Sequence, residues 1–484
     1  MKKEGEPLRP VPPGKAGLQE TSEKEDARQA RYLEVLRYLY GLQKFGIKLG
    51  LQNIRGLLQA LGNPERGLKC IHVAGTNGKG STCAAIASIL QASGKKTGLF
   101  TSPHLLSFTE RMRINGEEIS AQKTVELAGE VKDAVERSKA TNVFPAGLNL
   151  TFFEFVTAMA LLWFRQEGVE WAVLETGMGG RLDSTNVITP EVSVIATVGM
   201  DHREFLGSTL REIAAEKAGI MKKGVPVVLG PQRPEALEVL EARFASLNGD
   251  RESPGLFLYG RDFFATLCAS SGDGVTFDYS SSSFRAKGLF FPLAGDYQII
   301  NAAAAAEAVT AAGLGSEASI REGLRLTRMP GRLELMEDTP EIRLDGAHNP
   351  DAAEALAGAL KKIFLSHAGR RLILVLGIMG DKDIDGIMAP LLALAAATGG
   401  KAIFTAPAYG RAANPEELKK HAEALGFKTD ITSASPLSRA IREARELARP
   451  EDLIVITGSF YTAGEAKGIL KHEGGKFSRL RESR

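Results

Sequence analysis

The chain has 484 residues, more than one ordinary hydrophobic core can organise, so we expect two domains. Its 44% hydrophobic and 24% charged residues are typical of a soluble globular protein. The formal net charge is only +2, from 60 basic and 58 acidic residues, which argues against bulk binding of nucleic acid or of an anionic membrane. Any site for phosphate groups must therefore be local.

The first 28 residues carry charges of both signs and several prolines but no apolar segment, which predicts a mobile tail and not a signal peptide. Helical periodicity begins near Tyr32, so the predicted tail covers 1–31. The longest apolar run, 155–164, is too short to cross a bilayer, which needs about 20 residues. The protein is therefore expected to be cytoplasmic, with no membrane and no nucleic-acid partner.

The cysteines support the same compartment. Cys70, Cys83 and Cys268 are widely spaced and odd in number, which fits neither a disulfide framework nor a zinc pattern. Such usage is typical of a reducing environment.

From residue 69 onward, apolar runs alternate with helical patterns. The runs are CIHVA, TGLF, WAVLE, VSVIAT and VPVVL, at 70–74, 97–100, 171–175, 192–197 and 225–229. Strands separated by helices predict βαβ units and a mostly parallel sheet. Short strand-like pieces with Gly and Ser at 255–293 predict a small antiparallel subregion.

An alanine-rich helical stretch at 301–312 precedes Met329-Pro330-Gly331-Arg332, a break typical of a domain boundary. Strand-like runs then return as IRLDG, LILVLG, AIFTA and DLIVITG. The predicted fold is α/β. A P-loop ATPase domain at 32–329 has the mostly parallel sheet and the antiparallel subregion, and a smaller Rossmann-like α/β domain at 330–484 begins with a linker at 330–334.

A glycine-rich turn, GTNGKGST at 75–82, joins the first predicted strand to a helical stretch. Glycines let backbone N–H groups converge on phosphate oxygens, and the helix N-terminus adds positive potential. Lys79 would reach the β- and γ-phosphates, and a hydroxyl at Ser81 or Thr82 would face a phosphate or its Mg²⁺. The spacing departs from GxxxxGK[ST], because Val73 and Gly80 break the pattern. A tight turn with an exposed lysine is therefore the alternative.

Downstream polar residues also follow predicted strands. Glu175 ends WAVLE and His202 follows VSVIAT, so both lie toward the carboxyl edge of the sheet, where ligand crevices form. A carboxylate at such an edge suits Mg²⁺. Lys217 lies in the helical sequence EKAGI. Taken singly, a histidine or a helical lysine is more often structural or solvated.

The motifs together resemble the folylpolyglutamate synthase/dihydrofolate synthase family of the Mur ligase superfamily. They occur in the family's order over most of the chain. They are GTNGKGS at 75–81, TSPHL at 101–105, TFFEF at 151–155, ETGMGGRLDSTN at 175–186, DH at 201–202, EKAGI at 216–220, Gln298 with Asn301, PGRLE at 330–334, LDGAHNPD at 344–351 and GSFY at 458–461.

The resemblance implies a site for ATP and two Mg²⁺ ions. Lys217 matches a lysine that is carbamylated in the family and helps to hold the second Mg²⁺. Ser102, Glu175 and His202 match the other metal ligands. The implied ATP contacts are Thr76, Asn77, Gly78, Lys79, Gly80 and Ser81 in the phosphate loop, together with Asn301, Arg332 and Asp345.

The resemblance also implies where the other substrates bind. His348 and Ser459 match the glutamate side, with a structural role in their loops as the alternative, and the implied catalytic residues are Lys79, Lys217 and His348. The segments that match the folate site are Lys48, Leu49, Gly50 and Leu51, then Thr151, Phe152, Phe153 and Glu154, then Leu182, Asp183 and Ser184.

The implied reaction joins L-glutamate to a folate or dihydropteroate carboxylate. An amide does not form unaided from a carboxylate and an amine, because the leaving group would be oxide, so ATP would first convert the acid to an acyl phosphate. Catalysis then rests on positioning and charge neutralisation, with no covalent protein nucleophile and a monomeric enzyme expected. Whether the acid is dihydropteroate, a reduced folate or both stays open.

Three other functions are considered. A Mur-type ligase acting on a cell-wall precursor is the nearest. A P-loop kinase or switch NTPase would leave Lys217 and the second domain without a role. A non-catalytic folate-binding protein would bind pterins without ATP turnover.

Overall fold

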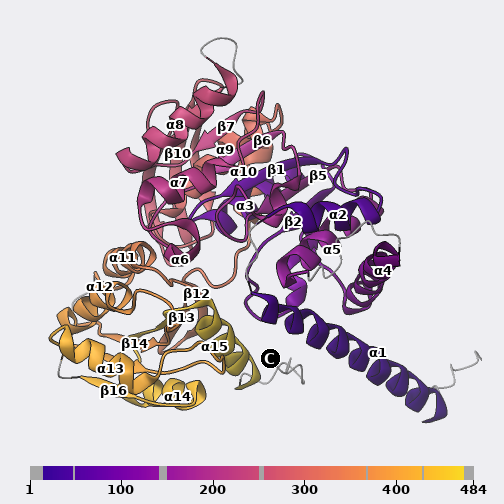
Figure 1. Cartoon of the computed structure of the whole chain (residues 1–484). Coiled ribbons are helices and arrows are strands. Elements are labelled where there is room, and N and C mark those ends of the chain that lie inside the picture. Colours follow the sequence, from indigo (N-terminus) through magenta and orange to yellow (C-terminus); the bar gives the residue numbers. More distant parts are fainter. Residues whose placement is uncertain are drawn as a thin grey trace, which may run out of the picture.

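The first predicted strand lies at the centre of an eight-stranded sheet in the computed structural model, which describes residues 15–46, 50–140, 150–249, 255–366, 369–427 and 430–473 (Figure 1). Six neighbouring strands of this sheet are parallel, and the two at one edge are antiparallel. In spatial order the strands are β4 (Glu117–Glu118), β3 (Met112–Ile114), β2 (Thr97–Phe100), β5 (Trp171–Glu175), β1 (Lys69–Ala74), β6 (Val192–Ile195), β7 (Val227–Leu229) and β8 (Leu256–Leu258).

Both faces of the large sheet are covered, which explains why its central strands are continuous apolar runs. Successive residues of β1 point to opposite faces: Cys70 packs into one core, and Ile71 and Val73 pack into the other. The first core contains α1 (Lys15–Gly41), η1 (Leu42–Phe45), α2 (Gln52–Ala60), η2 (Phe108–Arg111), α4 (Ala121–Ala140) and α5 (Phe152–Gln166).

The second core lies between the large sheet and a three-stranded antiparallel sheet, which confirms the predicted antiparallel subregion. Strands β9 (Phe263–Ser271), β10 (Gly274–Ser281) and β11 (Arg285–Phe291) form that sheet. Between the two sheets lie α3 (Lys79–Ala92), α9 (Gln298–Ala311) and α10 (Glu317–Leu326). Shorter connections and flanking helices are η3 (Ser184–Val187), α6 (Arg203–Leu206), α7 (Leu210–Ala218) and α8 (Pro234–Asn248).

The C-terminal α/β domain has its own six-stranded sheet, parallel except at β12. The strand order is β12 (Glu334–Asp338), β13 (Glu341–Leu344), β17 (Leu453–Thr457), β14 (Leu372–Leu376), β15 (Lys401–Phe404) and β16 (Ile431–Ser433). One face packs on α11 (Pro350–Ala359), the π-helical η4 (Leu360–Phe364), α12 (Ile384–Ala397) and α13 (Pro415–Ala424), and the other packs on α14 (Leu437–Leu447) and α15 (Phe460–Glu473).

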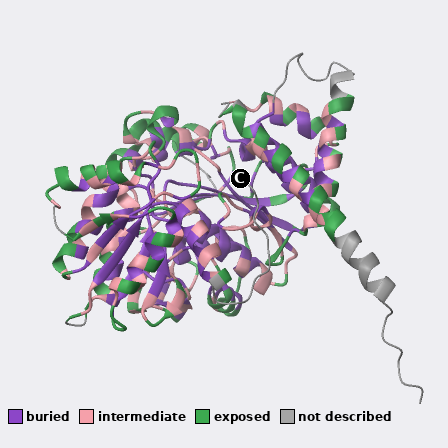
Figure 2. Cartoon of the chain, turned by 90° about the horizontal axis from the view of Figure 1, so that it is seen from below, coloured by how far each residue is buried: buried purple, intermediate pink, exposed green. Residues whose placement is uncertain are grey.

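Burial follows this layered arrangement. In Figure 2 the strands are mostly buried, and the exposed residues gather on the outer faces of the helices and on the loops. No helix in the described part of the chain is both long enough and apolar enough to cross a membrane.

Helix α1 begins at Lys15, within the segment that the sequence predicts as a mobile tail. Tyr32, Leu36 and Leu39 are buried in the first core at helical spacing, which anchors the C-terminal half of α1. Once anchored, the helix extends through Glu, Lys, Ala and Arg residues, which all favour helix. Residues 1–14 lie outside the described residues.

Asp452 joins the two central strands of the C-terminal sheet. It lies just before β17, is fully buried, and accepts bonds from Arg371, just before β14: backbone N to Oδ1 at 3.1 Å and Nε to Oδ2 at 3.0 Å. Arg449 N donates to Oδ2 at 2.8 Å. Burial alone would raise the pKa of Asp452, but the bonds from Arg371 and Arg449 lower it overall.

We predict that Asp452→Ala lowers the free energy of unfolding by about 2–3 kcal/mol, because it leaves Arg371 and two backbone N–H groups without their acceptor. Urea denaturation followed by circular dichroism measures this. Since the folded pKa is depressed, the contribution is present above the unfolded pKa of about 3.9 and is lost as the pH falls below it. The matched control is Glu451→Ala, an exposed neighbour, which should change stability by less than about 0.5 kcal/mol. Equal losses in the two variants would contradict the assignment.

Candidate active site

The carboxyl ends of three neighbouring strands meet at one edge of the large sheet. Strand β1 lies between β5 and β6, and all three are parallel, so the loops that follow them are adjacent. The predicted phosphate loop follows β1. Glu175 is the last residue of β5, and the segment that leads to His202 follows β6.

The phosphate loop between β1 and α3 is held from two sides. Gly78 has a φ of +87°, and a Cβ at this position would lie 2.3 Å from Asn301 Oδ1 in α9, so only glycine fits. Thr76 Oγ1 donates to Gly199 O at 2.9 Å and lies 3.0 Å from Gly199 N. The predicted ATP contacts Thr76, Gly78 and Asn301 therefore lie together.

Lys79 opens α3 at the end of this loop. Its Nζ donates to Gly75 O at 3.0 Å, so the ammonium group lies over the loop and not in bulk solvent. Its charge also acts on the pKa values of Glu175, Lys217 and His202. The predicted phosphate-directed lysine and the predicted metal ligands thus share one electrostatic environment.

Glu175 is a buried carboxylate with an acceptor atom to spare. Ser102 N donates to Oε2 at 3.0 Å, which brings the two predicted ligands together, whereas Oε1 accepts no hydrogen bond from the described residues. Burial raises the pKa of Glu175, and the charge of Lys79 opposes this shift. A buried carboxylate beside a phosphate loop, with one oxygen left over, fits an Mg²⁺ ligand.

Lys217 is only 3% exposed, and its Nζ donates to Gly75 O at 2.9 Å. The two acids nearest to it in the motifs have other partners: Glu216 pairs with Arg181 at 2.7 Å, and Asp201 pairs with Lys382 at 2.5 Å. Burial and the charge of Lys79 lower the pKa of Lys217 to about 7. A neutral amine is therefore accessible at this position near neutral pH.

His202 has a φ of +50° and precedes α6. Partial removal from water, together with the charge of Lys382, lowers its pKa to about 4, so the imidazole is neutral at pH 7. Within the described residues no three His, Cys, Asp or Glu side chains form a ready cluster for a metal. The predicted set contains only two such residues, so a metal there would also need the Ser102 hydroxyl and a modified Lys217.

Polar contacts from the C-terminal domain reach this edge, and sequence reasoning did not predict these pairings. The side-chain amides of Asn77 and Asn349 exchange hydrogen bonds of 3.2 and 3.0 Å, and Asn349 is almost fully buried. Lys382 Nζ donates to Asp201 Oδ1, and His348 Nε2 lies 3.6 Å from Asp201 Oδ2. The Asn-Pro pair at 349–350 is a sequence signal for a helix start and could have drawn attention to Asn349. No comparable sequence signal pointed to Lys382.

The connection between the domains brings the remaining predicted ATP contacts together. Asp345 is buried and accepts from Leu333 N at 3.0 Å and Ala347 N at 2.8 Å, which holds the linker against the end of β13. The guanidinium group of Arg332 lies 4.6 Å over the ring of Phe460.

The predicted glutamate-side residues lie close by but also support their own loops. His348 Nδ1 is 2.9 Å from Gly346 O, and its ring is 5.4 Å from that of Phe460. Ser459 is buried and accepts from Thr462 N at 3.0 Å in the first turn of α15. Both residues therefore have the structural role that was the alternative for them.

An aromatic cluster surrounds the first turn of α5, where the folate site is predicted. Phe152 stacks on Tyr40 with ring centroids 5.8 Å apart. The guanidinium carbon of Arg111 lies 5.1 Å from the centroid of the Phe152 ring. Phe153 packs so close to Gly177 that a Cβ there would lie 2.6 Å from its ring. Sequence reasoning missed Tyr40 and Arg111, although the latter lies only a few residues beyond the TSPHL motif.

Other predicted folate residues shape the backbone. Thr151 and Glu154 form a capping box at the start of α5, with bonds of 2.7 and 3.2 Å. Asp183 accepts from Met178 N at 2.9 Å and Thr185 N at 3.0 Å, which holds the loop after β5. Of the remaining positions, Ser184 is buried, Leu182 is half-buried, Gly50 and Leu51 immediately precede α2, and Lys48 and Leu49 lie outside the described residues.

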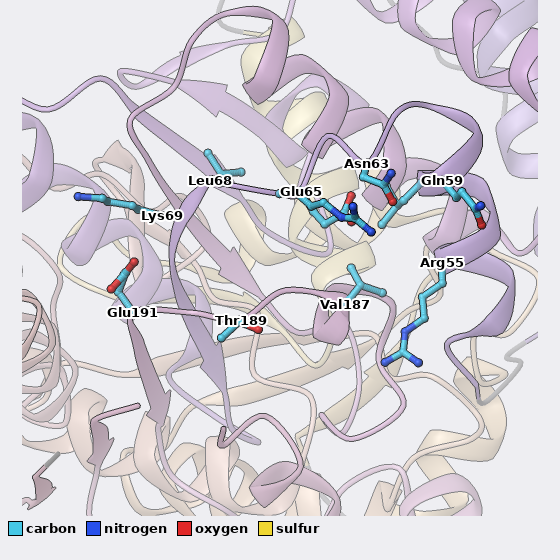
Figure 3. Close-up of a pocket in the computed structure, with 12 residues that line it drawn as sticks. Arg55, Gln59, Asn63, Glu65, Leu68, Lys69, Val187, Thr189 and Glu191 are labelled. Atoms are coloured by element: carbon cyan, nitrogen blue, oxygen red, sulfur yellow. The ribbon is translucent and has the colours of Figure 1, made fainter. Parts of the chain in front are cut away.

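A cavity of about 900 Å³ lies elsewhere (Figure 3). Arg55, Asn63, Glu65, Lys69 and Glu191 are among its lining residues. Lys69 is the first residue of β1, whereas the phosphate loop follows the last, so this cavity lies at the opposite end of the strand and takes no part in the site above.

Comparison with known proteins agrees with this geometry. The Mur ligase middle domain matches residues 73–309, and the Mur ligase glutamate ligase domain matches residues 331–460. Folylpolyglutamate synthase of Lacticaseibacillus casei is 38% identical, over 92% of this chain and 99% of that protein. Dihydrofolate synthase/folylpolyglutamate synthase of Escherichia coli is 32% identical, over 91% of this chain and 96% of that protein.

Solved structures show the same relationship. Mycobacterium tuberculosis folylpolyglutamate synthase complexed with ADP has a TM-score of 0.83 and 31% identity, covering 93% of this chain and 100% of that chain. A structure described as an FPGS–AMPPCP–folate complex has a TM-score of 0.76 and 35% identity, covering 91% of this chain and 99% of that chain. The order of the motifs, the two matched domains and this full-length similarity show that the chain belongs to the folylpolyglutamate synthase/dihydrofolate synthase family of Mur ligases.

Proposed function

We propose that this chain is an ATP- and Mg²⁺-dependent ligase that joins L-glutamate to the carboxylate of a folate or of dihydropteroate. One observation carries the proposal: a phosphate loop, a buried carboxylate and residues of a second domain converge on one edge of the sheet. The similarity to folylpolyglutamate and dihydrofolate synthases supports these substrates, and the similarity to a structure complexed with ADP supports the nucleotide.

In the proposed reaction, the phosphate loop holds the phosphates of ATP with its backbone N–H groups, from Thr76 to Ser81, and Lys79 adds positive charge over the loop. The remaining nucleotide contacts are proposed to come from Asn301 in α9, Arg332 in the linker and Asp345 just after β13. Bound Mg²⁺ would neutralise charge on the transferred phosphoryl group. The residues proposed to hold it are Ser102, Glu175, His202 and Lys217.

The acid substrate then becomes an acyl phosphate by attack of its carboxylate oxygen on the γ-phosphorus, with ADP leaving. The amine of glutamate attacks the acyl carbon, loses its proton, and expels phosphate. Because the acyl phosphate is prone to hydrolysis, water must be kept out, and the contacts of Asn349 and Lys382 with the first domain provide that closure. His348 lies beside Asp201 at the contact between the two domains, and we assign it to the glutamate side.

We further propose a cytoplasmic, monomeric enzyme with its domain boundary at residue 330, as the sequence predicts. The change from one sheet to the other between β11 and β12 supports the boundary. Size-exclusion chromatography with light scattering tests the monomer.

The function is tested by ATP- and Mg²⁺-dependent incorporation of labelled glutamate, with dihydropteroate, a reduced folate and a cell-wall precursor offered separately. We expect ADP release that needs both a pterin acid and glutamate. Lys79→Ala should reduce turnover by at least about 100-fold with an unchanged circular dichroism spectrum, because it removes charge aimed at the phosphates. Lys95→Ala, at a partly exposed residue paired with Glu170, is the control. ADP release without either co-substrate would favour an NTPase, and activity on the cell-wall precursor alone would favour the other Mur ligases.

We predict that Glu175→Gln raises the Mg²⁺ concentration for half-maximal rate by about 10- to 100-fold, because an amide oxygen is a weaker ligand than a carboxylate. Titration of the initial rate with Mg²⁺ measures this. The control is Glu170→Gln, at an exposed residue just before the first residue of the same strand. An unchanged Mg²⁺ requirement in both Glu175→Gln and His202→Ala would refute the assignment of these ligands.

Lys217 is proposed to react as its neutral amine with CO₂, releasing a proton and forming a carbamate. Its burial, its lack of an acidic partner within the described structure and its pKa of about 7 all support this. The product is an anion that can bind a cation, whereas an ammonium group would repel one.

We predict that Lys217→Ala is nearly inactive and partly rescued by a small added carboxylate, which fills the vacated space, whereas Lys217→Arg is inactive and not rescued. A direct readout is the ¹³C NMR signal of a carbamate after exchange with labelled bicarbonate. It should grow as the pH rises through about 7, where the amine loses its proton. An active Lys217→Arg enzyme without a carbamate signal in the wild type would rule the modification out.

A further inference from the structure

Arg111 is a buried cation that forms no ion pair with an acidic side chain among the described residues. It ends η2, is 8% exposed, and its Nε donates to His104 Nδ1 at 2.8 Å. Its two terminal nitrogens donate to no described residue. A guanidinium group has five N–H donors, so four of them are left for something else.

The nearest carboxylate along the chain is already engaged. Glu110 accepts from the backbone N atoms of Leu105, Leu106 and Ser107 at 2.8, 2.8 and 2.9 Å, so it serves the turn before η2. Glu110, Glu175, Tyr40 and Tyr461 are the groups near enough to oppose the effect of burial, which lowers the pKa of Arg111 overall. Burying a guanidinium without a bonded anion is unfavourable, and the contact with Phe152 offsets only part of that.

The place of Arg111 indicates what the missing anion is. The guanidinium group contacts Phe152 and His104, which belong to an aromatic cluster with Tyr40 and Phe108 that offers ring faces and edges. The buried carboxylate of Glu175, at the phosphate loop, is within electrostatic reach of the same group. An acid with an aromatic body and a terminal carboxylate would fill this arrangement from the cluster toward the loop.

We propose that Arg111 binds the carboxylate of the acid substrate through its terminal nitrogens and so directs the aromatic acid toward the phosphate loop. This rests on the proposed function and adds to it a residue that recognises the acid end of the substrate. The planar fork of a guanidinium matches the two oxygens of a carboxylate, which a lysine cannot reproduce.

The test measures binding and not turnover. Isothermal titration, with a non-hydrolysable ATP analogue and Mg²⁺ present, compares dihydropteroate with its primary carboxamide, which keeps the ring system and loses the charge. If the function test selects a reduced folate, that folate and its diamide replace the pair. The proteins are the wild type, Arg111→Gln, Arg111→Lys and the control Arg113→Gln. Arg113 lies two residues further along the chain in β3 and pairs with Glu118 at 3.1 Å, away from the cluster.

We expect the wild type and Arg113→Gln to bind the acid at least about tenfold more tightly than the amide, as a charge-assisted pair of hydrogen bonds allows. Arg111→Gln should lose this preference: binding of the acid weakens by about tenfold or more, whereas binding of the amide changes by less than about threefold. Arg111→Lys should recover part of the preference for the acid, because it restores the positive charge without the planar guanidinium group. It also tests the role of the charge if Arg111→Gln does not fold.

Equal weakening of acid and amide in both Arg111 variants would overturn the proposal and leave Arg111 as a support for Phe152. So would a preference for the acid that survives both substitutions. A rise in the KM for glutamate, with unchanged binding of the acid, would also overturn it by assigning Arg111 to the amino acid. A different result would count against the proposed function itself. It is that the wild type binds the ATP analogue but neither the acid nor the amide.

Discussion

The phosphate loop at 75–78 is the point at which contacts from four parts of the chain converge. It receives Lys217 from α7, Thr76 anchors it to the segment after β6, α9 supports it at Gly78, and the C-terminal domain reaches it through Asn349. The close approach of α9 is allowed only because Gly78 has no side chain. A change in the conformation of this loop would therefore displace the predicted metal ligands, the nucleotide contacts and the domain interface together.

The site contains buried charges that the protein itself leaves incompletely neutralised. Glu175 keeps one oxygen without a hydrogen bond from the described residues, Lys217 has only a backbone carbonyl, and Arg111 has a ring and a histidine. Each arrangement is unfavourable in the protein alone, because charges lose solvation on burial. Bound nucleotide, cation and acid would supply the missing partners, so the energy stored in these groups favours binding of the complete set of substrates. This arrangement is typical of sites that act by electrostatic preorganisation.

The two domains contribute different halves of the reaction. The first domain supplies the phosphate loop, the proposed cation ligands and the aromatic cluster, whereas the second supplies the proposed glutamate-side residues. The contacts between them include polar ones: an exchanged pair of amide hydrogen bonds at Asn77 and Asn349, and ion pairs of Asp201 with Lys382 and of Arg233 with Asp351. Leu105 of the first domain also packs in an apolar core of the second. Polar contacts of this kind can break and reform at small net cost, because water replaces them when the domains separate. That property suits an enzyme that must open to admit substrates and close to exclude water.

Sequence alone determined the α/β class, the strands that alternate with helices, the antiparallel subregion and the loops that carry chemistry. These features are local: apolar runs, glycine positions and strand ends are visible within a few residues. Local reasoning did not predict that helix α1 starts as early as Lys15, because the apolar residues that anchor α1 begin only at Tyr32. Roles implied for Thr151, Glu154 and Asp183 also needed the structure, since their side chains hold backbone turns as well.

Only the tertiary structure decided which distant residues meet. Asn349 lies 272 residues from Asn77 and Lys382 lies 181 residues from Asp201, and no pattern within either segment names its partner. The orientation of Arg111 toward Phe152, without an acidic partner in the described structure, likewise depends on how η2 packs against α5. Sequence motifs specify which groups are present, because each motif is continuous along the chain. The packing of two domains specifies which of those groups are left to bind a substrate, because burial and pairing are properties of the folded whole.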